Sequence, residues 1–221
     1  LDEGVSLKSD LFRRTDRSGV RDVFRTVSTA NISDAMHRER ELPEIRSLVP
    51  GIKIVGPAFT VRTAPGDWAK PVAAIDMAAE GEVLVIDAGG VPPAIWGELA
   101  TNSAQQKNLA GVVIYGAVRD SEDIREMGFG VFTRHVASAA GEPKGFGECA
   151  TTLHIAGRRI EPGDWIIGDD DGVMVVPRQR AVEVANRAMD VLERENRIRD
   201  EIQRGSTLGQ VVEIEKWEKR S

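Results

Sequence analysis

The sequence predicts one layered α/β domain, and two features of its apolar patterning lead to that prediction. Over residues 51–133, short apolar runs of strand length alternate with segments of helical periodicity. In the second half, several short strands alternate with turns before one long amphipathic helix. A chain of 221 residues can form one such domain with a substantial core. We expect residues 1–221 to form a single domain, with 1–17 as a peripheral or flexible segment and 178–221 as a C-terminal helical extension.

The elements of the first half are predicted in order as follows. A helix covers residues 20–27, and a second begins at Ser33 with Ser33 or Asn31 as its N-cap. Asp34 is a catalytic candidate, although a capping or structural hydrogen-bond role is favoured. Residues 51–63 form a strand in which Pro57 marks a bulge or an edge. After a turn at 65–67, a helix over 70–80 ends at Gly81. Its predicted apolar face contains Val72, Ile75, Met77 and Ala79.

Further along, residues 82–87 read as a strand buried on both faces, because the run is almost entirely apolar. A glycine–proline loop follows, and a helix is expected to begin at Ala94. Strands at 111–115 and 130–133 then flank a helix at 120–127. The second half contains strands at 152–155, 159–160, 164–167 and 173–176, with a tight acidic loop at 168–172. One amphipathic helix over 178–204 completes the chain, and its apolar stripe contains Val182, Ala185, Ala188, Met189 and Leu192.

Composition limits the classes of function and location. The net charge is −6, which argues against a general nucleic-acid-binding protein because such proteins usually present a basic face. The single cysteine, Cys149, excludes an internal disulfide and favours a reducing compartment. No apolar run reaches membrane-spanning length, and the N-terminal residues lack the pattern of a signal peptide. We therefore expect a cytoplasmic protein that binds neither membranes nor nucleic acid.

Three charged residues give the strongest functional signal. Glu98 and the pair Arg119-Asp120 are separated by twenty residues, over which a helix (99–107) and a strand (111–115) are expected. A helix and a strand of that length can return the chain to its starting end, so the three side chains can meet in one cleft. Two carboxylates beside a guanidinium suit a hard divalent cation next to an anionic substrate. The alternative is a surface turn with a local ion pair and an acidic residue in a helix's first turn.

Other motifs carry weaker signals. Gly89-Gly90 before a helix can cradle an anion or form a tight connection. The acidic run at 169–171 does not fit an EF-hand and reads as a β-turn. Neither a dinucleotide-binding glycine motif nor a Walker lysine is present. His37, His135 and His154 are scattered without triad or metal spacing, and Cys149 reads as a small core or loop residue.

An ordered series of short motifs resembles the class II pyruvate aldolase family that includes 4-hydroxy-4-methyl-2-oxoglutarate aldolase and the regulator of ribonuclease activity A. The series extends over most of the chain, from about residue 33 to 205. It consists of SDA (33–35), GPAFTV (56–61), PGD (65–67), GEVLVID (81–87), WGELA (96–100), GAVRD (116–120) and GDDDGV (168–173).

The resemblance implies a swivelling β/β/α domain of the phosphohistidine type that assembles as a homotrimer or a pair of trimers. It implies that Asp120 binds a divalent metal, Mg²⁺ or Mn²⁺, while Glu98 holds metal-bound water. Arg119 would bind the 2-oxo acid, and the backbone of Gly97, Glu98 and Leu99 would help to bind its carboxylate. A glutamate from a neighbouring subunit's C-terminal helix would also hold metal-bound water. Glu195 is the positional choice for that glutamate, and Glu193 is the alternative.

The implied function is a metal-dependent lyase that cleaves 4-hydroxy-2-oxo acids to pyruvate through an enolate, and the same site can decarboxylate oxaloacetate. Two positions depart from the family pattern: Glu98 replaces an aspartate, and His135 stands where glycine is common. Both leave the identity of the substrate open. The other class of function that the resemblance offers is a non-catalytic, protein-binding regulator. The chain keeps both Arg119 and Asp120, which favours the enzyme.

Overall fold

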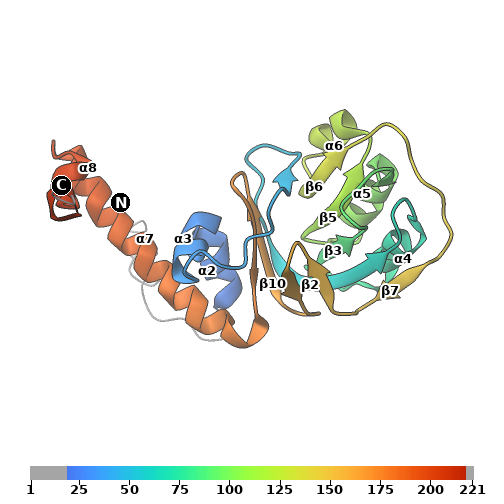
Figure 1. Cartoon of the computed structure of the whole chain (residues 1–221), viewed down its shortest axis with the longest axis horizontal. Helices are drawn as coiled ribbons and strands as arrows, with labels where there is room; N and C mark the ends of the chain where they lie inside the picture. The colour runs from blue at the N-terminus through green and yellow to red at the C-terminus, as the bar shows by residue number, and fades with distance from the viewer. Residues whose placement is uncertain (1–18, 218–221) are drawn as a thin grey trace, which may run out of the picture.

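The computed structural model describes residues 19–217, so the segment 1–17 lies outside the described residues. The described chain forms a mixed α/β domain with a strongly curved sheet and a long C-terminal helix (Figure 1). This architecture confirms the predicted layered α/β fold. No helix within residues 19–217 is long and apolar enough to cross a membrane.

The main sheet has the strand order β1-β6-β5-β3-β2-β10-β11, with β4 beside β5 and β7 beside β2. Strands β2, β3, β5 and β6 run parallel, whereas β10 and β11 continue the sheet antiparallel. A separate hairpin contains β8 and β9. The strands are β1 (Arg46–Ser47), β2 (Ile54–Thr63), β3 (Val83–Asp87), β4 (Ala94–Trp96), β5 (Gly111–Val118), β6 (Val131–Val136), β7 (Gly147–Cys149), β8 (Leu153–Ile155), β9 (Arg158–Ile160), β10 (Trp165–Asp169) and β11 (Gly172–Val176).

Strand β2 joins the two parts of the sheet. Its first residues, up to Pro57, pair with β10, and pairing with β3 begins at Ala58. Pro57 has no N–H to donate, so it fits the position where one ladder ends and the next begins. The proline predicted at a bulge or an edge therefore marks a change of partner strand instead.

The helices cover two opposite sides of this curved sheet (Figure 1). Helices α4, α5 and α6 lie on one side, and α2, α3 and α7 lie against the side formed by β10 and β11. The helices are α2 (Val20–Thr26), α3 (Thr29–Ala35), α4 (Ala69–Met77), α5 (Glu98–Gln106), α6 (Ser121–Met127), α7 (Ala181–Gln203) and α8 (Leu208–Val211), with 3-10 turns η1 (Arg178–Arg180) and η2 (Ile214–Trp217).

The core has three parts because the parallel strands are buried on both faces. Leu84 and Ile86 of β3 pack against the layer of α4, α5 and α6. Val83 and Val85 of the same strand point to the inside of the curve, toward β10, β11 and the β8–β9 hairpin. The outer face of β10 and β11 packs against α2, α3 and α7. This alternation explains why the run at 82–87 is apolar at nearly every position.

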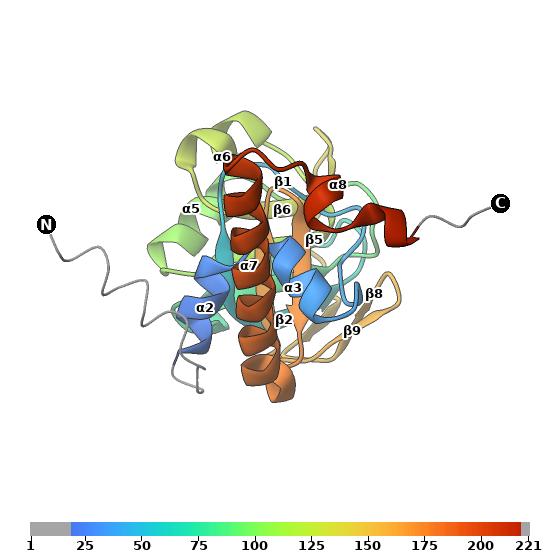
Figure 2. The same cartoon turned by 90° about the vertical axis from the view of Figure 1, so that its left-hand side faces the viewer.

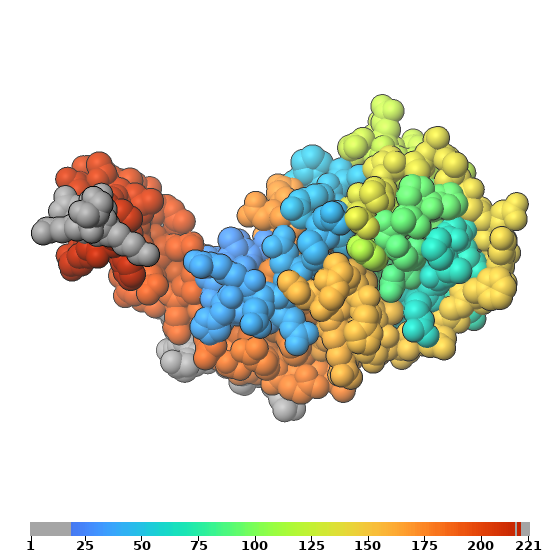
Figure 3. Space-filling model, in the orientation of Figure 1, coloured from blue at the N-terminus to red at the C-terminus, as the bar shows by residue number. Residues whose placement is uncertain are grey.

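Helix α7 lies against α2 and α3 over its first half (Figure 2) and then projects away from the domain (Figure 3). Its buried residues end at Met189, and the later part is exposed or half-buried. The predicted apolar stripe is confirmed, since Ala185, Ala188 and Met189 are buried and Val182 and Leu192 pack beside them. The predicted start at residue 178 differs slightly, because Arg178–Arg180 form a 3-10 turn.

Three local predictions were wrong. No helix begins at Ala94, because Ala94–Trp96 pair with β5 as a buried strand and the helix starts at Glu98. Helix α3 starts at Thr29 rather than Ser33. Its cap is Ser28, whose side chain accepts from the Asn31 N–H, while the Asn31 side chain accepts from the Ser28 N–H.

The third error concerns the apolar face of α4. Its buried residues are Pro71, Ala74 and Ile75, at the spacing of one helix face. Of the predicted face, only Ile75 is buried, whereas Val72 and Met77 are 39% and 58% exposed.

Candidate active site

The strand ends of β4 and β5 bring the predicted site residues together. The two strands are parallel neighbours, and β4 leads into α5 while β5 leads into α6. The Arg119 N–H donates to the Trp96 carbonyl oxygen over 3.0 Å, which fixes the two strand ends against each other. Glu98, Arg119 and Asp120 therefore meet where strands end and helices begin, a common location for ligand sites in α/β folds.

Asp120 is held in an uncommon backbone conformation at the start of α6. Its φ and ψ angles are 56° and 42°, in the left-handed region. A residue other than glycine adopts this conformation only at a cost in free energy. Its Oδ2 atom accepts the Glu98 N–H over 3.1 Å and lies 3.5 Å from Nε of Arg119. The backbone turn and these contacts fix the carboxylate beside the guanidinium.

Gly97 allows this carboxylate to approach the backbone. A Cβ atom at position 97 would lie 2.4 Å from Asp120 Oδ2 and 3.2 Å from Arg119 Cγ. The backbone of Gly97 is extended, so any residue could adopt its angles. The requirement for glycine here comes from close approach and not from backbone conformation.

Arg119 and Asp120 border a small, mostly apolar cavity of about 180 Å³. Such a volume is below the roughly 300–1,000 Å³ of pockets for drug-sized ligands, so it suits a small molecule. Arg119 and Asp120 line the cavity, with side chains 47% and 35% exposed. The rest of the lining comes from α4, β4, the start of α5 and the loop after β6, and consists of Trp68, Val72, Ala94, Ile95, Trp96, Gly97, Leu99, Ala100 and Ala140.

The first turn of α5 adds hydrogen-bond donors to this cavity. The N–H groups in the first turn of a helix have no acceptor within the helix, and Gly97 provides no side-chain cap. The Glu98 N–H donates to Asp120, whereas the N–H groups of Leu99 and Ala100 have no acceptor within the helix and remain available to a ligand. A guanidinium together with a helix N-terminus favours an anionic group in the ligand.

The Glu98 side chain occupies a different position from the one expected. It lines a shallow acidic hollow with Asp123, Glu126 and Met127 of α6, next to the cavity that Arg119 and Asp120 line. Its backbone thus belongs to the site through the bond to Asp120, while its carboxylate lies on the side of α6.

Asp120 has the donor chemistry of a hard-cation site. Its Oδ1 atom accepts no hydrogen bond within the part of the chain that the structure describes. Mg²⁺ is often held by one or two carboxylates, with waters and substrate oxygens completing its shell. Over residues 19–217, no group of three or more His, Cys, Asp or Glu residues is arranged so that it could hold a metal ion. Asp120 can therefore supply a carboxylate ligand to a divalent cation, but one chain supplies only part of the ligand set.

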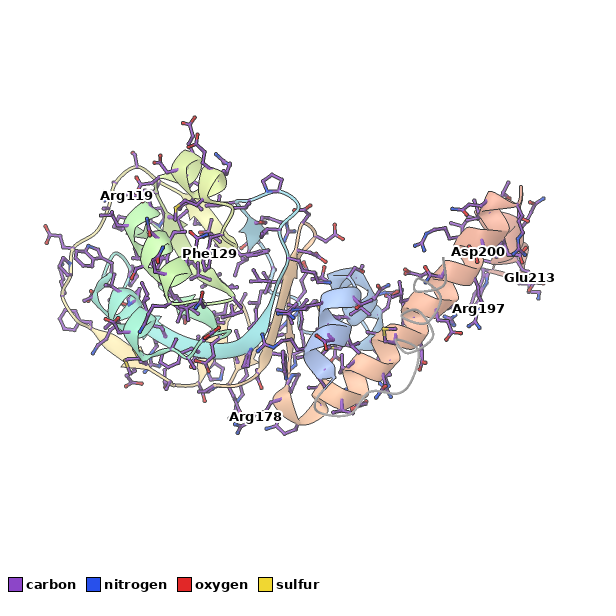
Figure 4. All side chains as sticks on the ribbon, turned by 180° about the vertical axis from the view of Figure 1, so that it is seen from behind. Arg119, Phe129, Arg178, Arg197, Asp200 and Glu213 are labelled. Carbon is purple, nitrogen blue, oxygen red and sulfur yellow. The ribbon has the colours of Figure 1, made fainter. Side chains whose placement is uncertain are left out.

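The predicted glutamates of the C-terminal helix lie far from this cavity. Figure 4 shows Arg119 on the body of the domain, whereas Arg197 and Asp200 lie on the projecting part of α7. Within its own chain, Glu195 accepts a hydrogen bond from the Asn31 side chain over 3.0 Å, and Glu193 forms an exposed ion pair with Arg197. A role for either glutamate at the site requires a second copy of the chain.

The remaining predicted motifs have structural partners. The Gly89 N–H donates to Asp87 Oδ1 and the Gly90 N–H to the Tyr115 carbonyl oxygen, so this loop is a tight connection. The Gly90 carbonyl oxygen accepts from Arg134, and His135 Nε2 lies 3.1 Å from it. These contacts support the loop that leads into β4.

The acidic run at 169–171 forms the β10–β11 turn that its composition predicted. Asp169 accepts hydrogen bonds from the backbone and side chain of Thr29. Within residues 19–217, the Asp34 side chain forms only an exposed ion pair with Arg38. Both aspartates therefore have structural contacts that account for their positions.

A buried carboxylate, missed in the sequence, supports one side of the cavity. Asp67 is 1% exposed and accepts backbone N–H bonds from Ala69, Lys144 and Phe146. Burial disfavours its charged form, but these N–H groups outweigh that effect and lower the pKa of Asp67 to about 2. Because the bonds reach from the β2–α4 turn to the loop at 141–147, they fix the side of the cavity that Trp68 and Ala140 line.

The other missed residues are the apolar lining. Trp68 donates from Nε1 to the Gly141 carbonyl oxygen over 3.1 Å, so its ring is fixed at the cavity. Val72 is exposed on the face of α4 opposite the core. The one signal for this lining in the sequence was an apolar residue, Val72, that lies off the buried face of α4 formed by Pro71, Ala74 and Ile75.

Comparisons with known proteins agree with this fold. The RraA-like family, described as Aldolase/RraA, matches residues 29–175. The chain is 34% identical over 196 residues to protein MJ0644 of Methanocaldococcus jannaschii, covering 87% of this chain and 93% of the relative. It is 30% identical over 151 residues to a protein of Thermus thermophilus named 4-hydroxy-4-methyl-2-oxoglutarate aldolase, covering 67% and 92%.

Solved structures show the same architecture. A protein from Pseudomonas syringae pv. tomato superposes with a TM-score of 0.80 at 34% identity, covering 90% of this chain and 95% of that one. The RNA-processing inhibitor RraA from Thermus thermophilus superposes with a TM-score of 0.63 at 29% identity, covering 68% and 92%. The fold and the family match thus define an α/β protein of the aldolase/RraA type. The chain belongs to the RraA-like family, as its motifs predicted.

Proposed function

We propose that this protein is a divalent-metal-dependent lyase that cleaves 4-hydroxy-2-oxo acids to pyruvate and also decarboxylates oxaloacetate. The observation that carries the proposal is the pairing of Arg119 with Asp120 at a cavity that also receives the N-terminus of α5. The name of the Thermus thermophilus relative supports the same reaction class.

Arg119 is assigned to the pyruvoyl end of the substrate. Its planar guanidinium can bind a carboxylate or the 2-oxo oxygen in a fixed orientation, and the free N–H groups of Leu99 and Ala100 offer further donors. Breaking the C3–C4 bond moves an electron pair toward the 2-oxo oxygen, where negative charge develops. A guanidinium fixed beside that oxygen stabilises this charge.

Asp120 is assigned to hold a divalent cation, Mg²⁺ or Mn²⁺, through its unpaired Oδ1 oxygen. When bound, such a cation supplies a Lewis acid for the developing negative charge. A water near Glu98 is assigned to accept the proton of the 4-hydroxyl group, and this water would have to link the cavity to the Glu98 carboxylate in the adjoining hollow of α6. Because Glu98 has one methylene more than aspartate, its carboxylate has a longer reach from the first turn of α5.

We propose further that the active unit is a homo-oligomer, a trimer or a pair of trimers. Among the described residues, Asp120 is the one acidic side chain that lines the cavity, with Glu98 in the adjoining hollow, whereas Glu193 and Glu195 lie on α7, where Glu195 bonds to Asn31 of its own chain. A neighbour's Glu195 would add a carboxylate that holds metal-bound water, with Glu193 as the alternative.

The competing function is a non-catalytic regulator that binds a protein. The structural relative from Thermus thermophilus, described as an RNA-processing inhibitor, is the observation that favours this alternative. The experiment that separates the two functions is pyruvate release from 4-hydroxy-4-methyl-2-oxoglutarate and from oxaloacetate. We expect release with Mg²⁺ or Mn²⁺ that stops with excess chelator. Folded protein that is inert with both metals and both acids would support the regulator.

A further inference from the structure

Helix α5 carries a buried hydroxyl group in its first turn, next to the strand end that leads to the site. Thr101 is fully buried, and Trp96, the last residue of β4, is 3% exposed. The Trp96 Nε1–H donates to Thr101 Oγ1 over 2.9 Å, and Thr101 Oγ1 also lies 2.9 Å from the Gly97 carbonyl oxygen. Because an indole nitrogen only donates, the hydroxyl accepts from Trp96 and gives its one proton to Gly97. Thr101 thus bonds two consecutive residues.

The two residues that Thr101 bonds are also the ones that contact the charged pair of the site. The Trp96 carbonyl oxygen accepts the Arg119 N–H over 3.0 Å. Gly97 lies so close to Asp120 that a Cβ atom at position 97 would be 2.4 Å from Oδ2. A shift of the 96–97 segment would therefore change the position of Arg119 relative to Asp120.

Packing alone does not require a hydroxyl group at position 101. The Trp96 ring belongs to an apolar core cluster that includes Ile95 and Ala104. Valine has nearly the same shape as threonine and would fill the same space, so threonine adds only the pair of hydrogen bonds. A buried polar group with satisfied bonds fixes one orientation of its partners, because other orientations leave a donor or an acceptor unpaired.

We propose that Thr101 is a positioning residue for the site, an inference that rests on the proposed function. Its hydroxyl group fixes the 96–97 segment, and that segment fixes Arg119 against Asp120. Thr101 is not among the described residues that line the cavity, so it acts through these neighbours.

Two substitutions at this position test the role of the hydroxyl group. Thr101→Val removes it and keeps the side chain's shape. The backbone N–H of residue 101 already donates to the Gly97 carbonyl oxygen, so the loss falls on the Trp96 indole, which is left without its acceptor. We expect kcat/KM for pyruvate release to fall by about tenfold or more, since small displacements of catalytic groups have effects of this size. Thr101→Ser keeps the hydroxyl group and should stay within about threefold of the native value.

Binding measurements separate positioning from a general loss of structure. Mn²⁺ alone needs the Asp120 carboxylate, whereas pyruvate added to the Mn²⁺-loaded protein needs Arg119 and Asp120 in the correct mutual geometry. By calorimetry, we expect Thr101→Val to keep the Mn²⁺ dissociation constant within about threefold and to raise that of pyruvate by about tenfold. In the metal-free protein, hydrogen exchange at the Trp96 indole, measured by NMR, should be faster in Thr101→Val than in the native protein or in Thr101→Ser.

Thr60→Val is the matched control for the loss of a buried hydroxyl group. Thr60 is equally buried on β2, and its Oγ1 donates to the Thr151 carbonyl oxygen over 2.6 Å. It is not among the described residues that line the cavity. We expect urea unfolding to show that Thr60→Val is destabilised as Thr101→Val is, while its kcat/KM stays within about twofold of the native value.

The outcomes separate this inference from the proposed function. Native kcat/KM and native pyruvate affinity in folded Thr101→Val would overturn the inference while the proposed function stands. A loss of kcat/KM in Thr60→Val or Thr101→Ser as large as that in Thr101→Val would also overturn it, because the missing hydroxyl group at position 101 would not be the cause. A native protein that neither binds nor releases pyruvate, with Mg²⁺ or Mn²⁺ present, would overturn the proposed function and the inference together.

Discussion

The replacement Gly97→Ala tests the geometry on which the site depends. The added Cβ would lie 2.4 Å from Asp120 Oδ2, about 1 Å short of ordinary van der Waals contact. The extended backbone at position 97 accepts alanine, so the substitution acts through this contact alone. Asp120 must then move by about 1 Å, and its hydrogen bond from the Glu98 N–H must lengthen or break.

A displacement of about 1 Å at a catalytic group can lower kcat/KM on the order of 10²-fold. We expect a loss of that size for pyruvate release, with the fold retained. We also expect the free energy of unfolding to fall by roughly 1–3 kcal/mol, the typical effect of overpacking. Urea unfolding measures the second quantity without any assumption about the substrate.

A double-mutant cycle shows whether Asp120 is the cause. In an Asp120→Ala background the carboxylate is gone, so adding Gly97→Ala should change the free energy of unfolding by much less than it does alone. Gly209→Ala is the matched control, because a Cβ there meets Ile214 at an ordinary 3.5 Å. Equal destabilisation by Gly97→Ala with and without Asp120 would refute the argument from close approach.

Three further predictions address the guanidinium, the buried carboxylate and the subunit boundary. Arg119→Lys should lower kcat/KM on the order of 10²-fold, because lysine keeps the charge but loses the bidentate fork; activity within about twofold of wild type would remove Arg119 from the site. Asp67→Asn should lower the free energy of unfolding by about 2 kcal/mol at pH 7. Since the folded-state pKa of Asp67 is lowered to about 2, its contribution is present above pH 4 and is lost as the pH falls through about 2. A mutational loss that stays equal from pH 7 to pH 2 in urea titrations would contradict this. Mixing Arg119→Ala with Glu195→Ala, each folded and inactive, should restore some activity; no recovery after proven subunit exchange would show that Glu195 does not act across a boundary.

The sequence identifies the strands of this fold well because burial on two faces leaves an apolar run. Val83–Asp87 and Gly111–Val118 are both of this kind, and both were predicted within a few residues. Short elements were harder to predict from the sequence. The three residues Ala94–Trp96 carry an apolar pattern that is the same in a strand and at a helix start, and only their pairing with β5 decides between the two.

The site was predictable to the extent that it depends on spacing along the chain. Arg119 and Asp120 follow a strand, and Glu98 begins the neighbouring helix, so the topology brings their backbones together. The direction of the Glu98 side chain and the contact of Gly97 with Asp120 depend on local angles that no periodicity reveals. Asp67 was read only as part of a turn, because its partners lie near residue 145, far along the chain.

The central claim is that Arg119 and Asp120 hold the 2-oxo acid and a divalent cation together. The most direct test is a crystal structure of the assembled protein soaked with pyruvate and Mn²⁺, in which anomalous scattering locates the metal. We expect the metal at Asp120, with the pyruvate oxygens at the Arg119 guanidinium and the first turn of α5. Metal bound away from Asp120, or pyruvate bound without contact to Arg119, would contradict the account.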